Sequence, residues 1–516
     1  MDPDPNPPGR TLTTRRRFLG LLALGGSAAL AGCSGLTKPV REAAESATRI
    51  VSPTDPPVLT GTGPEPSSFV PPLPVARPSR FTDPLELVSD VCVVGGGAAG
   101  CAAATTAGRM GARTILLEES YCLGGNVTRG LVNLDKVAWG GSEAMVAGYF
   151  RELIKNLEAE GQAVYPGPQT HFAVPYEPDA FRHSALILAR RAGADVRFGA
   201  RAAWVERAGD RIEAVWAEEE GRMLRIRSKV FVDCTGDGHL GYMAGNGFWL
   251  GDRLYGEIQG QTLIFCAGPV DFSALQKYAD STGGLTNTYQ VIGLRDFMYG
   301  AVASGKVEGR PQRGLLINRN MESTFVSISG SEVYSNHLEP GTLAKIMTML
   351  QKQNFQIHAA LRAEIPGFES SRVTRMAERP YLREGRRLIG WTQLTADEVL
   401  AGRKPADSIA RGWYPIDLHV SYGGGLVHRG QLRAGDWYGV PFRCLVARDL
   451  DNLMMAGRCI SATHEALASA RISPVSMALG QAAGVGAALS VKAEIRPADL
   501  EAEKVREEII RQGGLI

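Results

Sequence analysis

The stretch LELVSDVCVVGGGAAGCAAATTAGRMGARTILLEES, residues 85–120, decides the fold. Its apolar run Asp90–Val94 predicts a short strand that is buried on both faces. Three glycines follow, and the small residues Ala98–Arg109 then predict a helix. Thr114–Leu117 predicts the next strand, which ends at Glu118. This order of elements is typical of the first βαβ unit of a parallel sheet.

The glycines of the turn have the spacing G-x-G-x-x-G at Gly95, Gly97 and Gly100. The first permits a tight turn, the second lets the backbone approach a pyrophosphate, and the third lets helix and strand pack closely. Glu118 follows 23 residues after Gly95, where a carboxylate can accept hydrogen bonds from a ribose. The context therefore favours a dinucleotide site over a purely structural glycine turn.

A second segment, near the C-terminus, favours a flavin over a nicotinamide cofactor. Leu453–Ala456 predicts a strand that is followed by Gly457 and Arg458. Ser473 is a suitable N-cap and Pro474 a suitable first residue for a helix of small residues. The N-terminus of that helix would stabilise negative charge on a reduced flavin.

The sequence resembles the bacterial FAD-dependent oxidoreductases that have a glutathione-reductase-like FAD fold. The matching stretches are VVGGGAAGCAAA (93–104), LLEESYCLGGNVT (116–128), VDCTGDGHLGYMAG (232–245), REGRRLIGWTQLTADEVLAGR (383–403), YPIDLHV (414–420) and NLMMAGRCISATHEALASARISPVSMALGQAAG (452–484). The resemblance implies FAD as cofactor, with a covalent or a noncovalent link, and it implies a set of contacts. These are expected at Gly95, Gly97, Ala98, Ala99, Gly100, Glu118, Glu119, Gly124, Gly125, Asn126, Thr128, Gly236, Asp237, Gly457, Arg458, Met477, Gly480 and Gln481. Asn126 departs from the family pattern, where a smaller or apolar residue is expected.

The expected fold class is α/β. A Rossmann-like FAD-binding domain would have a parallel central sheet and a β-meander, and an α+β cap domain for the substrate would be inserted into it. The FAD-binding domain is expected over residues 87–266 and 441–495, the cap over 267–440 and a C-terminal helix over 496–516.

The N-terminal residues predict export. Arg15 and Arg16 are followed by the apolar run Leu19–Ala31, and together they resemble a twin-arginine signal. The run is too short to span a membrane comfortably. Leu30–Cys33 resembles a lipobox, so residues 1–33 would form the signal and Cys33 would carry the lipid. The alternative is a plain signal that is cleaved near Ala31. The proline-rich residues 34–86 predict an extended tether.

Composition excludes several classes of site and partner. The formal charge of the 516-residue chain is +2, and the four arginines and two aspartates of residues 1–32 account for all of it. A near-neutral mature chain does not indicate a nucleic-acid partner. The eight cysteines form no C-x-x-C pair and no metal-type spacing, so no metal site is predicted. Cys122 stands alone beside the expected flavin, which argues against disulfide reductase chemistry.

Two histidines are the candidate catalytic bases. His464 is expected in a loop between Gly457–Arg458 and the following helix, where it would face the flavin. His419 is the second candidate, with Asp417 two residues away on the same face of a strand. For each, the alternative is a structural histidine that is satisfied by hydrogen bonds.

Arg383 and Arg387 are four residues apart, so on a helix they would share a face and could bind a substrate carboxylate or oxyanion. Surface ion pairs, or contacts that dock the cap domain, are the alternatives. The expected function is an exported dehydrogenase that transfers a hydride from a small polar substrate, a sugar or a hydroxy acid, to FAD. A separate acceptor, a cytochrome, a quinone or oxygen, would take the electrons. The open alternatives are a redox-neutral lyase or isomerase and a non-catalytic electron relay.

Overall fold

The computed structural model describes residues 83–134, 144–165, 167, 173–253, 255–319, 321, 323–421, 425–428 and 432–516. The chain divides into two compact units, residues 1–61 and 62–516, and every described residue belongs to the second. The predicted signal with Arg15, Arg16 and Cys33 lies outside the described residues, as does nearly all of the predicted tether.

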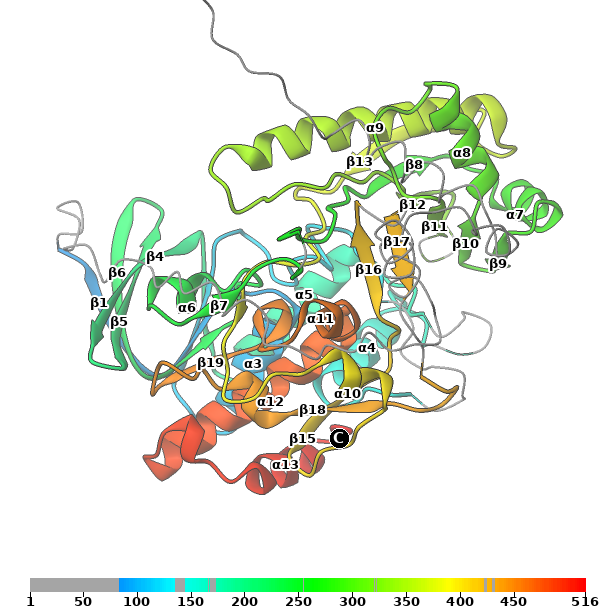
Figure 1. Ribbon diagram of the computed structural model, residues 1–516. Helices are drawn as coiled ribbons and strands as arrows, with labels where there is room; N and C mark the ends of the chain where they lie inside the picture. Colours follow the sequence, from blue (N-terminus) through cyan, green and yellow to red (C-terminus); the bar gives the residue numbers. More distant parts are fainter. Residues whose placement is uncertain are drawn as a thin grey trace, which may run out of the picture. The chain divides into compact units, whose positions relative to one another are not determined.

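A mixed sheet carries the predicted βαβ unit (Figure 1). Its order is β3-β2-β1-β6-β5-β4, and β19 also pairs with β6. The pairs β1–β2, β1–β6, β2–β3 and β6–β19 are parallel, whereas β4, β5 and β6 form an antiparallel meander. The strands are β1 (Leu85–Val94), β2 (Thr114–Glu118), β3 (Asp195–Phe198), β4 (Ala200–Ala208), β5 (Arg211–Glu219), β6 (Arg222–Asp233) and β19 (Leu453–Met455). This is the mixed α/β fold expected of a Rossmann-like FAD-binding domain.

Two predicted boundaries differ from the structure. Strand β1 begins at Leu85, so the last residues of the predicted tether already pair with β6, where Leu85 lies opposite Leu224. Helix α12 (Ser473–Ala493) begins one residue earlier than expected, so Ser473 is its first residue, and the N-cap Ile472 makes no side-chain cap.

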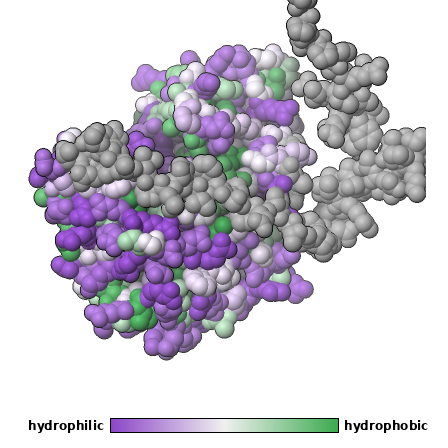
Figure 2. All heavy atoms as spheres, turned by 60° about the vertical axis from the view of Figure 1, so that its left-hand side comes forward, coloured by the Kyte–Doolittle hydropathy of each residue, from purple (hydrophilic) through white to green (hydrophobic). Residues whose placement is uncertain are grey.

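Small residues let α12 lie against α3 (Ala98–Arg109), and Figure 1 shows the two helices together. A Cβ atom on Gly480 would lie 2.1 Å from the carbonyl oxygen of Ala99, and one on Gly484 would lie 2.4 Å from that of Ala103. Among the described residues, α12 alone is long and apolar enough to cross a bilayer, but 83% of its apolar window is buried in the protein. Because most of this window is buried, α12 is a core helix of the protein. On the face drawn in Figure 2, hydrophilic residues predominate and hydrophobic ones occur in small groups.

A second sheet lies in the segment predicted as the cap, except that its strand β8 begins at Phe265, two residues before the predicted limit. It is antiparallel, in the order β13-β8-β12-β11-β10-β9, and three helices accompany it with a separate hydrophobic cluster. Its elements are β8 (Phe265–Gly268), α7 (Phe272–Ser281), β9 (Leu285–Asn287), β10 (Gln290–Gly293), α8 (Arg295–Ala303), β11 (Leu315–Arg319), β12 (Val326–Ser329), α9 (Thr342–Glu364) and β13 (Arg372–Met376).

Residues 394–440 pack differently from the second sheet, because their buried side chains, such as Trp413 and Tyr438, share one cluster with α3 and α12. The limits of the cap at residues 267 and 440 stay a prediction. The remaining elements are α4 (Tyr149–Ala159), α5 (Pro178–Arg191), α6 (His239–Met243), β7 (Phe248–Trp249), β14 (Arg387–Leu388), α10 (Ala396–Leu400), β15 (Ser408–Gly412), β16 (Asp417–Val420), β17 (Gly425–His428), β18 (Tyr438–Pro441), η3 (Phe442–Leu445), η4 (Gly457–Cys459), α11 (His464–Ala470), η5 (Pro497–Asp499) and α13 (Ala502–Arg511).

Candidate functional site

The glycine turn between β1 and α3 leaves room for a ligand at the start of the helix. Gly95 has φ +99°, and a Cβ on Gly100 would lie 1.8 Å from the carbonyl oxygen of Gly95, so both glycines are required by the backbone itself. A Cβ on Gly97, by contrast, would meet nothing within 4 Å. Gly97 is the N-cap of α3, whose first N–H groups and dipole favour an anion. The open position therefore fits the pyrophosphate of a dinucleotide.

A carboxylate is fixed beside this turn. Glu118 ends β2, and its Oε2 atom accepts a hydrogen bond of 2.7 Å from the backbone N–H of Gly96. Its Oε1 atom accepts from the backbone N–H of Ser120 at 2.9 Å. Glu119 is half exposed and lies 3.9 Å from Arg129 and 3.8 Å from Arg379. Of the two predicted acids, Glu118 is thus held at the glycine turn and Glu119 lies toward solvent.

A second glycine turn packs on the first. Gly124 forms a parallel bridge with Gly97, and a Cβ on Gly125 would lie 3.0 Å from the Cα of Gly97. Asn126 donates its amide to the carbonyl of Leu382 at 3.3 Å, and Thr128 donates its hydroxyl to the carbonyl of Leu123 at 2.7 Å. The amide of Asn126 therefore ties this turn to the segment that carries Arg383.

Asp237 and Arg458 form a buried ion pair of 3.2 Å, and Arg458 also lies against Gly236. His337, which precedes α9, places its Nε2 atom 3.2 Å from Asp237. Burial alone would raise the pKa of Asp237, but the charges of Arg458 and His337 outweigh it and hold the pKa well below its usual range. The Nη1 atom of Arg458 and the Nδ1 atom of His337 are buried and have no hydrogen-bond partner within the described residues. These nitrogens fit an oxygen-rich cofactor. No sequence signal indicated His337.

The residues predicted on and around α12 mainly contact other helices. Ala99 on α3 packs near Gly457 and Gly480, and Ala98 lies beside it at the helix start. Met477 is buried. Gln481 accepts a hydrogen bond of 3.1 Å from the backbone N–H of Tyr149, so its side chain is engaged at the start of α4. Any contact that Met477 or Gln481 makes with FAD stays a prediction.

His464 opens the short helix α11 and is not in a loop as expected, because Thr463 caps this helix by accepting from the backbone N–H of Ala466 at 3.2 Å. His464 is 3% exposed, and its Nδ1 atom lies 2.9 Å from Oε2 of Glu384. Glu384 is fully buried and also accepts from the backbone N–H of Gln259 at 3.1 Å. A buried histidine–carboxylate pair is thus held beside the turn that carries Arg458.

Arg383 and Arg387 lie on no helix, which corrects the expectation, because β14 begins at Arg387 and the preceding residues are irregular. Both side chains are buried rather than at the surface. Arg387 pairs with Glu384 and donates to the carbonyls of Ala462 and Gly251 at 3.1 and 2.9 Å. Burial lowers the pKa of Arg387 to about 10, so it stays charged at neutral pH.

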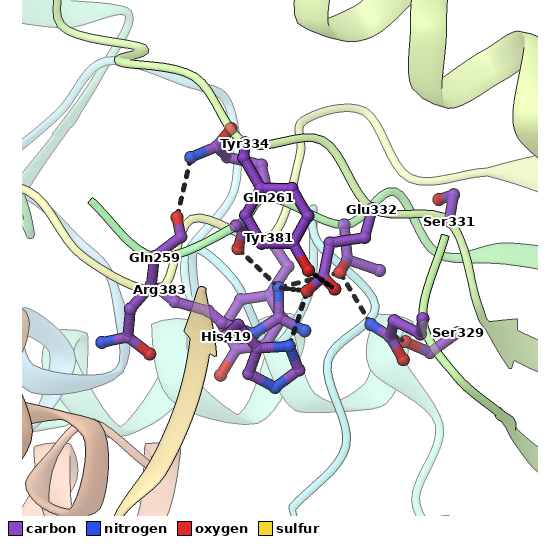
Figure 3. Close-up of polar contacts among 12 residues, drawn as sticks. Gln259, Gln261, Ser329, Ser331, Glu332, Tyr334, Tyr381, Arg383 and His419 are labelled. Atoms are coloured by element: carbon purple, nitrogen blue, oxygen red, sulfur yellow. Dashed lines mark hydrogen bonds and ion pairs between the residues drawn. The ribbon is translucent and has the colours of Figure 1, made fainter. Parts of the chain in front are cut away.

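His419 belongs to a second buried cluster (Figure 3). It lies on β16, with Nδ1 2.5 Å from Oε1 of Glu332 and Nε2 3.4 Å from Asp417. The expected neighbourhood of His419 and Asp417 is confirmed. The hydroxyl of Tyr334 donates to Glu332 at 2.6 Å, and Arg383 lies 3.5 Å from the same carboxylate. Burial would raise the pKa of Glu332, but His419 and Arg383 outweigh it and lower the pKa.

Arg383 connects the cluster to the segment before β8. Its Nη1 atom donates to the carbonyl of Gly260 at 2.7 Å and to the hydroxyl of Thr262 at 2.8 Å. Sequence reasoning missed Glu332, Tyr334, Glu384 and Gln259. Glu384 lies within a quoted family stretch, but the others carry no local pattern that marks them.

Within the described part of the chain, no group of three or more His, Cys, Asp or Glu residues is placed to hold a metal ion. The described cysteines are free, and burial raises the pKa of Cys92 and of Cys101 to about 12. These two thiols are therefore core residues.

Residues 90–509 match the family described as FAD dependent oxidoreductase. No curated protein matches the chain closely enough to count as a relative. Solved structures with a similar fold include a geranylgeranyl bacteriochlorophyll reductase-like protein from Thermoplasma acidophilum, at 14% identity, with 83% of this chain and 84% of that chain covered and a TM-score of 0.43. The p-nitrophenol 4-monooxygenase of Pseudomonas putida DLL-E4 is similar at 9% identity, with 83% and 85% covered and a TM-score of 0.40.

A flavoprotein/dehydrogenase from Cytophaga hutchinsonii has 14% identity, 83% of both chains covered and a TM-score of 0.39. Likenesses at this level carry no argument about the substrate. The family match covers most of the chain, and it agrees with the open glycine turn, the fixed Glu118 and the buried Asp237–Arg458 pair. The chain belongs to the FAD-dependent oxidoreductase family, and FAD is its cofactor.

Proposed function

We propose that the protein is an exported dehydrogenase that oxidises an alcohol carbon of a small polar substrate. FAD supplies the hydride acceptor, and a separate cytochrome, quinone or oxygen molecule takes the electrons onward. The observation that carries this proposal is the buried pair of His464 and Glu384, with 2.9 Å between Nδ1 and Oε2. An alcohol that loses a hydride must also lose its hydroxyl proton, so the site needs one positioned base.

The geometry of the His464–Glu384 pair suits the role of this base. When Glu384 accepts a hydrogen bond from the N–H group at Nδ1 of His464, the ring tautomer is fixed and Nε2 becomes the atom that takes the substrate proton. The carboxylate then stabilises the imidazolium that forms. Arg387 beside Glu384 balances the carboxylate before the reaction. Gln259 fixes the same carboxylate from its backbone N–H.

Reduction of the flavin by candidate substrates tests the function. The purified yellow protein is mixed without oxygen with a panel of sugars, polyols and hydroxy acids, and the loss of the oxidised flavin band is followed. Bleaching by at least one compound is expected, with colour restored when an acceptor is added. Steady product formation without any acceptor would contradict the dehydrogenase and support the redox-neutral lyase or isomerase.

The export proposal rests on Arg15, Arg16 and the apolar run that follows them. A cofactor loaded in the cytoplasm requires a route for folded chains, and the twin arginine resembles the signal of that route. Changing both arginines to lysine should leave FAD-loaded protein in the cytoplasm, whereas normal export of this variant would reject the proposal. Cys33→Ser should release the exported protein from membranes, and unchanged fractionation would remove the lipid anchor.

A further inference from the structure

Gln259 has a side chain that the fold itself does not satisfy. The residue is fully buried, and neither its Nε2 nor its Oε1 atom has a hydrogen-bond partner within the described part of the chain. A buried amide without partners is destabilising, and native structures contain few such groups. The amide is therefore placed for a molecule that is bound during function.

The position of Gln259 links it to the candidate base. Its backbone N–H donates to Glu384, the carboxylate that also holds His464. Figure 3 shows the side-chain amide of Gln259 pointing away from the His419 cluster, which includes Glu332 and Tyr334. The amide is thus separate from the His419 cluster, and its residue is tied through the backbone to the carboxylate that holds His464.

The charges around Glu384 and the His419 cluster disfavour an acidic ligand. The four buried arginines of the described chain face carboxylates. Arg387 pairs with Glu384, Arg383 with Glu332, Arg471 with Asp417 and Arg458 with Asp237. Glu465 and Asp252 add further negative charge near Arg387. A substrate carboxylate would therefore enter a region whose cations are already neutralised, and it would meet the carboxylate of Glu384.

We propose that Gln259 binds a hydroxyl group of an uncharged polyhydroxylated substrate, so that the enzyme selects a neutral sugar or polyol over a hydroxy acid. A hydroxyl both donates and accepts hydrogen bonds, as the two ends of an amide require, whereas an ionised carboxylate only accepts. This inference rests on the proposed dehydrogenase function and adds the substrate class to it.

The first test compares matched substrates on the FAD-loaded protein. D-Glucose, D-galactose and myo-inositol are compared with D-gluconate, D-galactonate and D-glucuronate by the concentration dependence of anaerobic flavin bleaching. Bleaching by neutral compounds with the acids at least tenfold weaker is expected. Acids that bleach as well as or better than neutral compounds would overturn the inference and leave the dehydrogenase proposal intact. Failure of every compound, with FAD bound, would count against the dehydrogenase itself and with it the inference.

The second test replaces the amide. Gln259→Leu should raise the apparent Kd of the bleaching substrate about 10- to 100-fold, the scale of losing one or two buried hydrogen bonds. The limiting bleaching rate should change much less. Gln290→Leu removes a buried amide from the second sheet, where Gln290 donates to Asn318 at 2.9 Å, and serves as the matched control with unchanged Kd.

A third measurement needs no substrate. Because the amide is unsatisfied in the free protein, Gln259→Leu should keep its FAD and have a Tm equal to or above that of the wild type. A clear fall in Tm would show that Gln259 is structural. A lowered affinity for FAD, with an unchanged substrate Kd once excess FAD restores occupancy, would assign the amide to the cofactor. Either outcome would overturn the inference.

Discussion

Two of the buried histidine–carboxylate pairs in the described part of the chain, those of His419 and His464, differ in how carboxylates surround the ring. In the His419 pair, Nδ1 faces Glu332 at 2.5 Å and Nε2 faces Asp417 at 3.4 Å. In the His464 pair, Nδ1 faces Glu384 at 2.9 Å, and the residue opens helix α11 just after the Gly457–Cys459 turn. The same two residue types therefore form two different arrangements.

The difference separates the two histidines as candidates for the proposed base. Both nitrogens of His419 are engaged by carboxylates, so this ring has no atom left to accept a substrate proton. It ties together β16, the loop of Glu332 and, through Asp417, the buried Arg471. Glu384 orients the ring of His464 through Nδ1, as the proposed base requires. His464 therefore stays the proposed base, and we expect a structural role for His419.

The largest expected effect separates the two histidines. His464→Ala should retain FAD and lower the rate of flavin reduction by about 10²–10⁴, the scale of a lost general base. His419→Ala should reduce flavin within about tenfold of the wild-type rate in the molecules that fold. Stopped-flow bleaching with the true substrate measures both. A large loss in the His419 variant alone would reverse the assignment.

The next effect is on stability and belongs to the His419 cluster. Glu332→Ala should lower the free energy of unfolding by about 3–5 kcal/mol, because it leaves His419 and Arg383 buried without their shared carboxylate. Denaturant unfolding monitored by fluorescence gives the value. A change below about 1 kcal/mol would mean that the cluster does not hold β16 and the segment of Glu332 together.

Asp417→Asn should have a smaller effect, about 1–3 kcal/mol, because shape is kept while the buried Arg471 loses the charge 3.1 Å away. Asp436→Asn is the matched control, since Asp436 pairs with Lys404 at 2.7 Å on the surface and should contribute less than about 1 kcal/mol. Thermal unfolding compares the two variants. Equal decreases in Tm would contradict the expectation that the buried ion pair stabilises the protein more than the surface pair.

The smallest expected effect is on the stability of the protein at low pH. Glu332 has a lowered pKa, so its contribution to stability is present above the ordinary glutamate pKa and is lost as the pH falls through the lowered value. Tyr334→Phe removes a hydrogen bond to the carboxylate, which should cost about 1 kcal/mol and move the onset of acid unfolding to higher pH. Unfolding curves between neutral pH and pH 2 measure the onset. An unchanged or lower onset would contradict this role of Tyr334.

The sequence by itself determined the cofactor half of the protein. The strand, turn and helix between Asp90 and Arg109 follow one another directly along the chain, and glycine is required in the turn by the backbone conformation and by close packing. Helix Ala98–Arg109 and the strand that ends at Glu118 accordingly lie as predicted.

Only the tertiary structure decided the arrangement around the candidate base. The four-residue spacing of Arg383 and Arg387 predicted a shared helix face, but a Cβ on Gly385 would lie 2.2 Å from Asp237, so this segment packs as irregular chain against another turn. Gln259, Glu332, Glu384, His419 and His464 come from five separate segments. Their partners are set by long-range packing, and neither spacing nor periodicity in the sequence records which buried charge faces which.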